Sequence, residues 1–172
     1  MIFVLFLLFT AAAAARQTSE GAGIYSSPVR VMAVNDGDTL TVRIRGRAEK
    51  IRLIGIDAPE MGQRPWGSRA KEHLQSLVSS SEWNVDAGFD VVQRDKYGRI
   101  LAYIFSKNGE LLNTRMIRDG YAVMFTLPPN VKYAGEFAEA QRQARERKLG
   151  IWGRDGLKQL PVDYRKTHPR SR

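Results

Sequence analysis

Three short segments of the chain carry acidic and basic side chains that suit metal-assisted chemistry on a phosphate. They are Asp36-Gly-Asp-Thr39, Arg52-Leu-Ile-Gly-Ile-Asp-Ala-Pro-Glu60 and Asp95-Lys-Tyr-Gly-Arg99. Carboxylates hold a divalent cation or take a proton from water, and guanidinium groups meet negative charge on phosphorus. Few other reactions need this combination. The segments therefore favour hydrolysis of a phosphodiester with the help of a metal ion.

Each segment alone has a plainer interpretation. Asp36 can belong to a hairpin turn, Asp57 can cap a turn, and Arg52 and Arg99 can be solvated surface residues. Glu60, however, follows Asp57 by three residues, so two acids converge where a strand ends. Paired carboxylates repel unless a cation lies between them. The metal site is then the better interpretation, and two planar guanidinium forks aimed at one anion suit a bidentate phosphate contact.

The composition narrows the classes of function. The 172 residues suffice for one domain with a real core, and the net charge of +9 suggests an anionic partner, with nucleic acid first. A soluble protein that is merely basic is the alternative. The chain has no cysteine, which excludes disulfide, zinc–thiolate and cysteine-nucleophile chemistry. The two histidines, His73 and His168, are interpreted as surface residues, because no motif surrounds either of them.

The N-terminus resembles a secretory signal. An apolar run over residues 2–9 is followed by Thr10 and five alanines, which is too short for a membrane span of ~20 residues. We expect a signal peptide over 1–15 with cleavage after Ala15, and hence a secreted or periplasmic protein. The basic residue usual near the start is missing, which leaves an uncleaved anchor or a misassigned start codon as alternatives.

Residue patterns along the rest of the chain predict strands and helices in a definite order. Alternating apolar residues predict strands near residues 29–33, 40–44, 51–56, 83–92 and 99–105. A helical stripe covers residues 68–80, a short helix ends before Gly120, and a second long helix follows Pro129.

Five short strands with one interposed helix predict an α+β fold, mainly a β barrel. The five-stranded oligonucleotide-binding (OB) barrel with three helices fits best. We expect a linker over residues 16–27, the barrel domain over 28–153 and a basic flexible tail over 154–172, where no apolar period is present.

Five segments of the chain, in order, resemble the staphylococcal nuclease (thermonuclease) family, from about Val29 to Trp152. They are Asp36–Thr39, Arg52–Glu60, Asp95–Tyr103, Asn113–Gly120 and Lys148–Trp152. Any one of them is a weak signal, whereas all five in order are a strong one.

The resemblance implies an OB-type barrel, one calcium ion and hydrolysis of DNA and RNA to products that keep the 3′ phosphate. It places the metal on the carboxylates of Asp38 and Asp57 and on the backbone carbonyl of Ala58. Glu60 matches the general base, Arg52 and Arg99 match the phosphate-binding arginines, and Asp36 matches an outer acid. A low ligand charge indicates weak calcium binding, about 10⁻⁴ to 10⁻³ M, and magnesium stays an alternative ion.

The sequence departs from the family in the nucleotide pocket. The founding member's pair of pocket tyrosines has no counterpart here, and Phe125 or Tyr121 is expected to stack on the base instead. Lys96 and Tyr97 are candidates for contacting the substrate phosphate, with plain surface exposure as the favoured role of Lys96. Trp66, Trp83 and Trp152 are interpreted as packing residues, and Trp66 is the one of the three most apt to be exposed near the site.

The resulting hypothesis is a secreted calcium-dependent nuclease with little sequence preference, acting as a monomer without a stable protein partner. An inactive nucleic-acid-binding OB module is the alternative, although this chain retains all five acids and arginines of the site. A protein of polysaccharide metabolism would use paired acids but gives no reason for the arginines.

Overall fold

The structure is a computed structural model that describes residues 26–169 of the chain. The predicted signal peptide over residues 1–15, its cleavage after Ala15 and most of the predicted linker over 16–27 lie outside the described residues. Within residues 26–169, no helix combines the length and apolar character needed to cross a membrane.

Five strands form a closed barrel, in the order β1-β2-β3-β6-β5. They are β1 (Ser26–Val34), β2 (Thr39–Ile44), β3 (Arg47–Leu53), β5 (Asn84–Gly88) and β6 (Ile100–Phe105). The β3–β6 pair is parallel, and the other four pairs are antiparallel. Alternate residues such as Leu40, Val42, Ile51 and Leu53 fill the barrel, as the period of two requires. The predicted five-stranded OB-type fold is confirmed.

The predicted third strand over residues 51–56 is wrong in one respect, because it is broken into two. Gly55 takes a left-handed φ of +77°, and a Cβ there would lie 2.3 Å from Cε2 of Phe137. The chain turns out of the barrel at this point. β4 (Gly55–Asp57) pairs instead with β7 (Val123–Phe125), a short strand that the sequence did not predict. This exit carries Asp57 away from the barrel wall.

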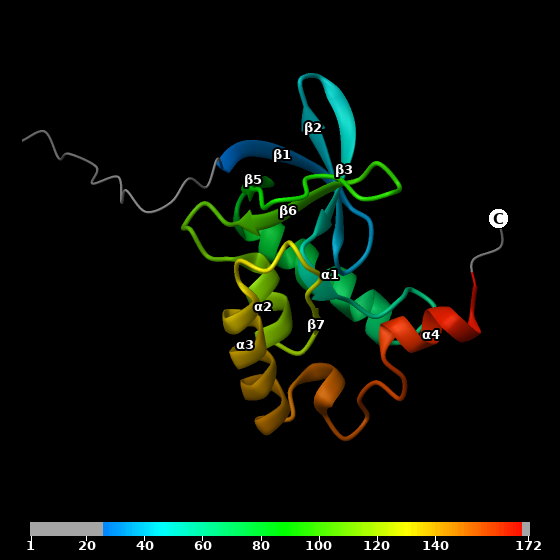
Figure 1. Cartoon of the computed structure of the whole chain (residues 1–172). Coiled ribbons are helices and arrows are strands. Elements are labelled where there is room, and N and C mark those ends of the chain that lie inside the picture. The colour runs from blue at the N-terminus through cyan, green and yellow to red at the C-terminus, as the bar shows by residue number, and fades with distance from the viewer. Residues whose placement is uncertain (1–25, 170–172) are drawn as a thin grey trace, which may run out of the picture.

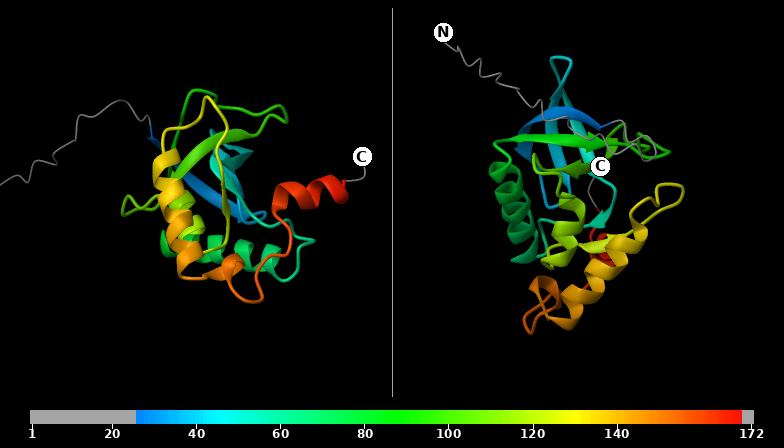
Figure 2. Two further views of the ribbon diagram at one scale, coloured as in Figure 1. Left: turned by 60° about the horizontal axis from the view of Figure 1, so that its bottom comes forward. Right: turned by 90° about the vertical axis from the view of Figure 1, so that its left-hand side faces the viewer.

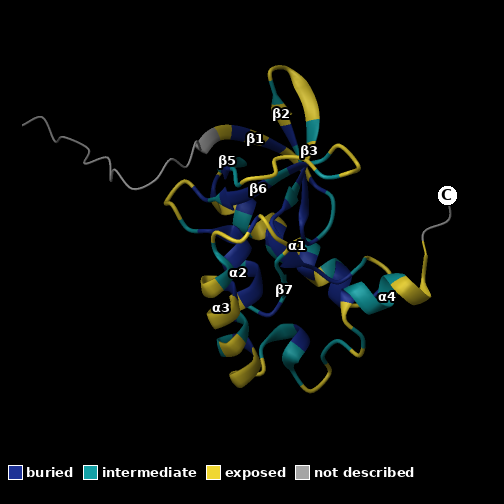
Figure 3. Cartoon of the chain, in the orientation of Figure 1, coloured by how far each residue is buried: buried dark blue, intermediate teal, exposed yellow. Residues whose placement is uncertain are grey.

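Three helices cover one end of the barrel (Figure 1). They are α1 (Trp66–Ser80), α2 (Leu112–Arg118) and α3 (Ala134–Glu146), and a 3₁₀ turn, η1 (Gly150–Trp152), follows them. Their apolar stripes join the barrel core, whereas the outer face of α3 and the β2–β3 hairpin are exposed (Figure 3). The buried amide of Asn113 ties α2 to the barrel, because it accepts from Ile104 N–H at 2.9 Å and donates to the Ile54 carbonyl at 2.8 Å.

A fourth helix, α4 (Pro161–Thr167), lies in the segment predicted to be a flexible tail. The three predicted helices are present, and α4 is an additional helix within residues 154–172. Pro161 sits in the first helical turn, where its missing N–H is harmless, but too few apolar residues follow to create a helical period. The left view of Figure 2 shows α4 standing apart from the other helices.

Candidate functional site

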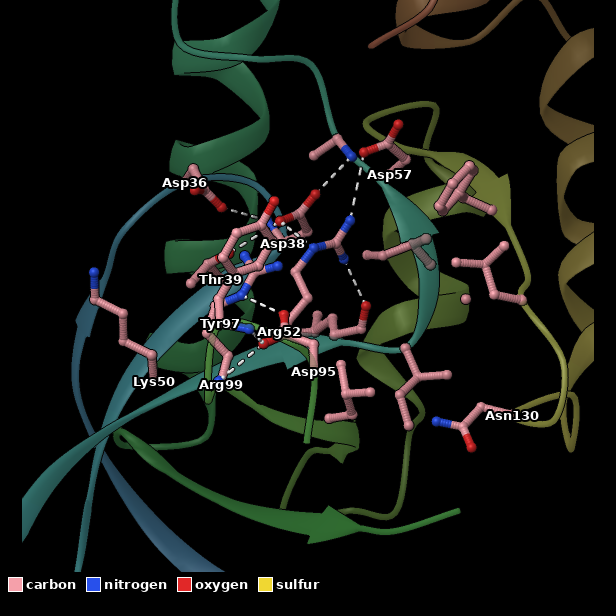
Figure 4. Close-up of a pocket in the computed structure, with 18 of the residues that line it drawn as sticks. Asp36, Asp38, Thr39, Lys50, Arg52, Asp57, Asp95, Tyr97, Arg99 and Asn130 are labelled. Carbon is pink, nitrogen blue, oxygen red and sulfur yellow. Dashed lines mark hydrogen bonds and ion pairs between the residues drawn. The ribbon is translucent and has the colours of Figure 1, made fainter. Parts of the chain in front are cut away.

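One open pocket of about 1170 Å³ gathers every predicted site residue (Figure 4). The residues contribute polar side chains or backbone atoms to the wall of this cavity, and they are Asp36, Asp38, Arg52, Asp57, Ala58, Glu60, Lys96, Tyr97 and Arg99. They come from the β1–β2 turn, from β3, from the exit strand β4 and from the turn before β6. Segments 60 residues apart thus meet because the barrel closes.

Asp38 and Arg52 face each other across the β2–β3 pair. Thr39 is the register partner of Arg52, and Leu53 N–H donates to the Asp38 carbonyl at 2.9 Å. Arg52 Nε lies 3.1 Å from Asp38 Oδ1, and the Ala58 N–H donates to Asp38 Oδ2 at 2.9 Å. The strand register and this bond therefore fix the Asp38 carboxylate against β4.

Asp57 is the most deeply buried acid of the pocket, with 1% of its side chain exposed. Arg52 Nη2 lies 3.4 Å from Asp57 Oδ1, so a single guanidinium contacts both Asp57 and Asp38. Burial raises the pKa of Asp57, and the hydrogen bonds and charge of Arg165, followed by the charge of Arg52, oppose that shift.

Asp36 lies behind this pair and accepts the Asp38 N–H at 3.1 Å on Oδ1. Burial, followed by the negative charge of Asp38, raises the pKa of Asp36 to about 6. Asp36 contacts Asp38 and holds its backbone, in agreement with a position outside the innermost pair of acids.

Arg99 shares a face of the barrel with Arg52. Arg52 is the register partner of Leu101 in the parallel β3–β6 pair, and Arg99 precedes Leu101 by two residues. Arg99 Nε donates to Asp95 Oδ2 at 2.7 Å, and its guanidinium lies 5.6 Å from the ring of Tyr97. Although partial burial opposes it, hydrogen bonds from the Arg99 side chain and from two backbone N–H groups lower the pKa of Asp95.

Arg165, on α4, is a pocket residue that the sequence analysis missed. Its Nη2 lies 2.8 Å from Asp57 Oδ2, and its Nη1 lies 2.9 Å from Asp57 Oδ1 and 3.0 Å from Glu60 Oε1. The hydrogen bond to Asp57, in particular, raises the pKa of Arg165. No local pattern in the sequence indicates that a residue 108 positions after Asp57 returns to it.

Comparison with known proteins identifies the family. Residues 50–154 match the family described as Staphylococcal nuclease homologue. The Thermonuclease of Staphylococcus intermedius is 33% identical over 129 residues, which cover 72% of this chain and 75% of that protein. The chain belongs to the staphylococcal nuclease family.

Two proteins of Bacillus subtilis (strain 168), with about the same percentage of identical residues, are named as endonucleases. Endonuclease YncB is 32% identical over 154 residues, covering 81% of this chain and 72% of that protein. The SPbeta prophage-derived endonuclease YokF is 34% identical over 128 residues, covering 70% of this chain. The matched region spans 42% of the length of YokF.

The donor set of the family member fits a hard cation. Residues 26–169 contain no group of three or more His, Cys, Asp or Glu side chains arranged to hold a metal ion. Asp38 and Asp57 already converge on one cationic group, Arg52, and Ala58 lies between them through its N–H bond to Asp38. Oxygen donors on a pair of acids already built around positive charge suit calcium or magnesium.

Phe125 and Tyr121, the two residues expected to stack on a base, lie in different surroundings. Phe125 lines the pocket, whereas Tyr121 stacks on His73 at a centroid distance of 4.2 Å and lies 6.4 Å from the ring of Trp66. Tyr121 is therefore not a pocket residue. Trp66 is buried, as expected of a packing residue. His73 is only partly exposed, and its Nε2 lies 2.8 Å from Asp119 Oδ2.

Proposed function

We propose that this chain is a calcium-dependent nuclease that hydrolyses DNA and RNA with little sequence preference and leaves 3′-phosphate products. The supporting observation is the pocket itself, in which Arg52 contacts both Asp38 and Asp57 while Glu60 and Arg99 line the same cavity. The endonuclease names of two relatives and the Thermonuclease name of a third agree with this proposal.

Asp38, Asp57 and the Ala58 carbonyl would hold the ion. When bound, calcium supplies positive charge that polarises a phosphate oxygen and helps to orient water. Arg52 is fixed by the β3 register and by the two acids, and its exposed fraction of 15% leaves part of the guanidinium open to the cavity. That placement suits a fork that meets a phosphate entering beside the acids.

Glu60 is the proposed general base. It takes a proton from the attacking water as the water oxygen bonds to phosphorus, and the bond from phosphorus to the 5′ oxygen breaks. The 5′ oxygen takes a proton from solvent water and leaves as a hydroxyl, and the phosphate stays on the 3′ side. Arg52 and Arg99 stabilise the negative charge that grows on the five-coordinate phosphorus.

Lys96 and Tyr97 are proposed substrate contacts at the rim of the pocket. Tyr97 is 73% exposed, and Lys96 Nζ lies 5.2 Å from its ring. An exposed aromatic ring beside cations suits stacking on an unpaired base and favours single-stranded substrate. We further propose export to a secreted or periplasmic location, where calcium is plentiful, and action as a monomer.

The deciding experiment measures acid-soluble nucleotides released from single-stranded DNA and from RNA. We expect release with calcium, loss of release with a chelator, and a decrease of about 10²-fold or more in kcat for Glu60→Gln. Glu139→Gln, the same change on the exposed face of α3, is the matched control and should retain full activity. Salt-sensitive DNA binding without cleavage would instead support the inactive binding module.

A further inference from the structure

The guanidinium of Arg165 occupies both oxygens of the most buried acid in the pocket. Its two contacts with Asp57, at 2.8 and 2.9 Å, form a bidentate pair, and the 3.0 Å contact with Glu60 comes from the same nitrogen as the second of them. One cationic group thus bridges a proposed metal ligand and the proposed general base. The pair is poorly solvated on the acid side, because 1% of the Asp57 side chain is exposed.

The chain that delivers Arg165 is anchored along the loop after Glu60. Gln63 Nε2 donates to the Gln159 carbonyl at 2.8 Å, and Trp66 Nε1 donates to the Asp155 carbonyl at 3.2 Å. The Tyr164 hydroxyl packs so closely on Gly62 that a Cβ there would lie 2.5 Å from it. Figure 1 shows α4 beside the loop that leads into α1. The docked position is therefore specific and does not depend on charge alone.

The helix itself adds no residue to the apolar cores found within residues 26–169. It has seven residues, of which Pro161 is buried, and a helix of that length is marginal in water without tertiary contacts. The apolar cores of the described residues extend to Ile151, with Trp152 and Leu157 packed against them, and they include no residue of α4. The helix can consequently leave without opening the barrel.

Arg165 covers both oxygens of Asp57, whereas Arg52 contacts Oδ1 alone, so a divalent cation and the Arg165 fork compete for this carboxylate. Both oxygens already accept from Arg165, and a cation binding there would meet the positive charge of the fork at close range. Either the cation or Arg165 holds the acid. Because Arg165 also holds Glu60, the exchange would change the surroundings of the general base at the same time.

We propose that α4 is an internal competitor of the divalent cation, so that cation binding at Asp57 expels Arg165 and releases α4. This inference rests on the proposed function for the identity of the cation site. In the docked state the nuclease is held inactive, and calcium both fills the site and removes the arginine from Glu60. The apparent calcium affinity then equals the intrinsic affinity multiplied by the fraction of molecules in which α4 is undocked.

Calcium titration by calorimetry, without substrate, tests the competition. Arg165→Gln removes the fork, and Lys166→Gln, a neighbour on the same helix that pairs with Asp163, is the matched control. We expect calcium to bind about tenfold tighter to Arg165→Gln, and Lys166→Gln to match the wild type. Arg165→Lys keeps the charge without the fork and should fall between the two. Thermal unfolding of each variant checks that the barrel is intact.

Hydrogen exchange supplies a second readout that does not depend on activity. In the wild type, calcium should increase exchange at the α4 amides while the β3 and β6 amides stay protected. Equal calcium affinity in Arg165→Gln and wild type, or α4 amides that stay protected with calcium, would overturn the proposal while the proposed nuclease function stands.

Two further outcomes separate the hypotheses. Weaker substrate binding by Arg165→Gln at saturating calcium, with unchanged calcium affinity, would make Arg165 a substrate ligand and overturn the competition. Absence of calcium binding and of cleavage in every variant would overturn the proposed function, and the competition with it.

Discussion

Two arginines bind Asp57, and they reach it from opposite kinds of structure. Arg52 lies within β3, between the buried residues Ile51 and Leu53, and its position is set by hydrogen-bonded neighbours on two strands. Arg165 lies on α4, a short helix with one buried residue. Arg52 therefore belongs to a strand of the barrel core, whereas Arg165 belongs to a helix that contributes no residue to the described apolar cores.

This difference in anchoring suggests different roles: Arg52 holds the acids of the site together, and Arg165 controls access to them. Arg52 contacts Asp38 and Asp57 from the barrel side and keeps two repelling carboxylates close. Arg165 contacts Asp57 and Glu60 from the solvent side, where 36% of its own side chain is exposed. Removing Arg52 should therefore lower activity, and removing Arg165 should leave the Asp57 carboxylate free to bind a cation.

The largest expected effect is that of Arg52→Ala, which tests the barrel side of this comparison. We expect kcat on single-stranded DNA with calcium to decrease by about 10²-fold or more, because a preorganised charge for the phosphate is lost and the two acids lose their shared partner. Arg142→Ala, an exposed arginine of α3 paired with acids, is the control and should leave kcat unchanged. Full activity of Arg52→Ala would contradict the assigned role.

A smaller effect, on the free energy of unfolding, tests how firmly the hydrogen bonds of Asn113 hold the barrel next to the site. Asn113→Ala removes both bonds of a fully buried amide and leaves the Ile104 N–H and the Ile54 carbonyl without that partner. We expect the free energy of unfolding to fall by about 2–3 kcal/mol. Urea denaturation measures the change.

Asn84→Ala is the matched control for this stability measurement, because Asn84 makes a single exposed bond to the Glu82 carbonyl. It should lower the free energy of unfolding by less than about 1 kcal/mol. If both variants lost the same stability, Asn113 would not have the special role that its two bonds indicate, and the exit of the chain at Ile54 would need another support.

The contrast between residues on barrel strands and residues on α4 also explains which parts of the site could be predicted from the sequence. The acids and arginines of the barrel were predicted because short motifs fall at strand ends, and strand alternation fixes which way each side chain points. The five-stranded barrel followed from that alternation as well. The break in the third strand was missed, because a single Gly55 inside an apolar run does not reveal that Phe137 will pack against it.

Arg165 could not be predicted for a different physical reason. Its helix has no apolar stripe to detect, and its position depends on hydrogen bonds to Gln63 and Trp66 that exist only in the folded chain. The hydrogen bond from Trp66 to the Asp155 carbonyl is equally hard to foresee, because the two residues are 89 positions apart in the chain. Long-range docking by polar contacts leaves little trace in a sequence pattern.

The smallest expected effect concerns Arg99, which stands between the two extremes. Arg99 precedes β6 but is held by Asp95 in its own turn, through a 2.7 Å side-chain bond and a 3.0 Å bond from its backbone N–H. Asp95→Asn keeps the shape and removes the charge, so Arg99 should stay in the pocket with less precise orientation. We expect kcat/KM on single-stranded DNA to fall by about fivefold to tenfold, well short of the loss in Arg52→Ala.

The pH profile of stability gives this prediction a second measure. The pKa of Asp95 is lowered in the folded state, so its stabilising contribution is present above the ordinary aspartate pKa and is lost as the pH falls through the lowered value. Asp95→Asn should therefore reduce the loss of stability on acidification. A loss of activity in Asp95→Asn as large as that in Arg52→Ala would mean that the turn positions its arginine as firmly as the barrel does. The site would then have a second rigid arginine, and Arg165 alone would remain as its movable cation.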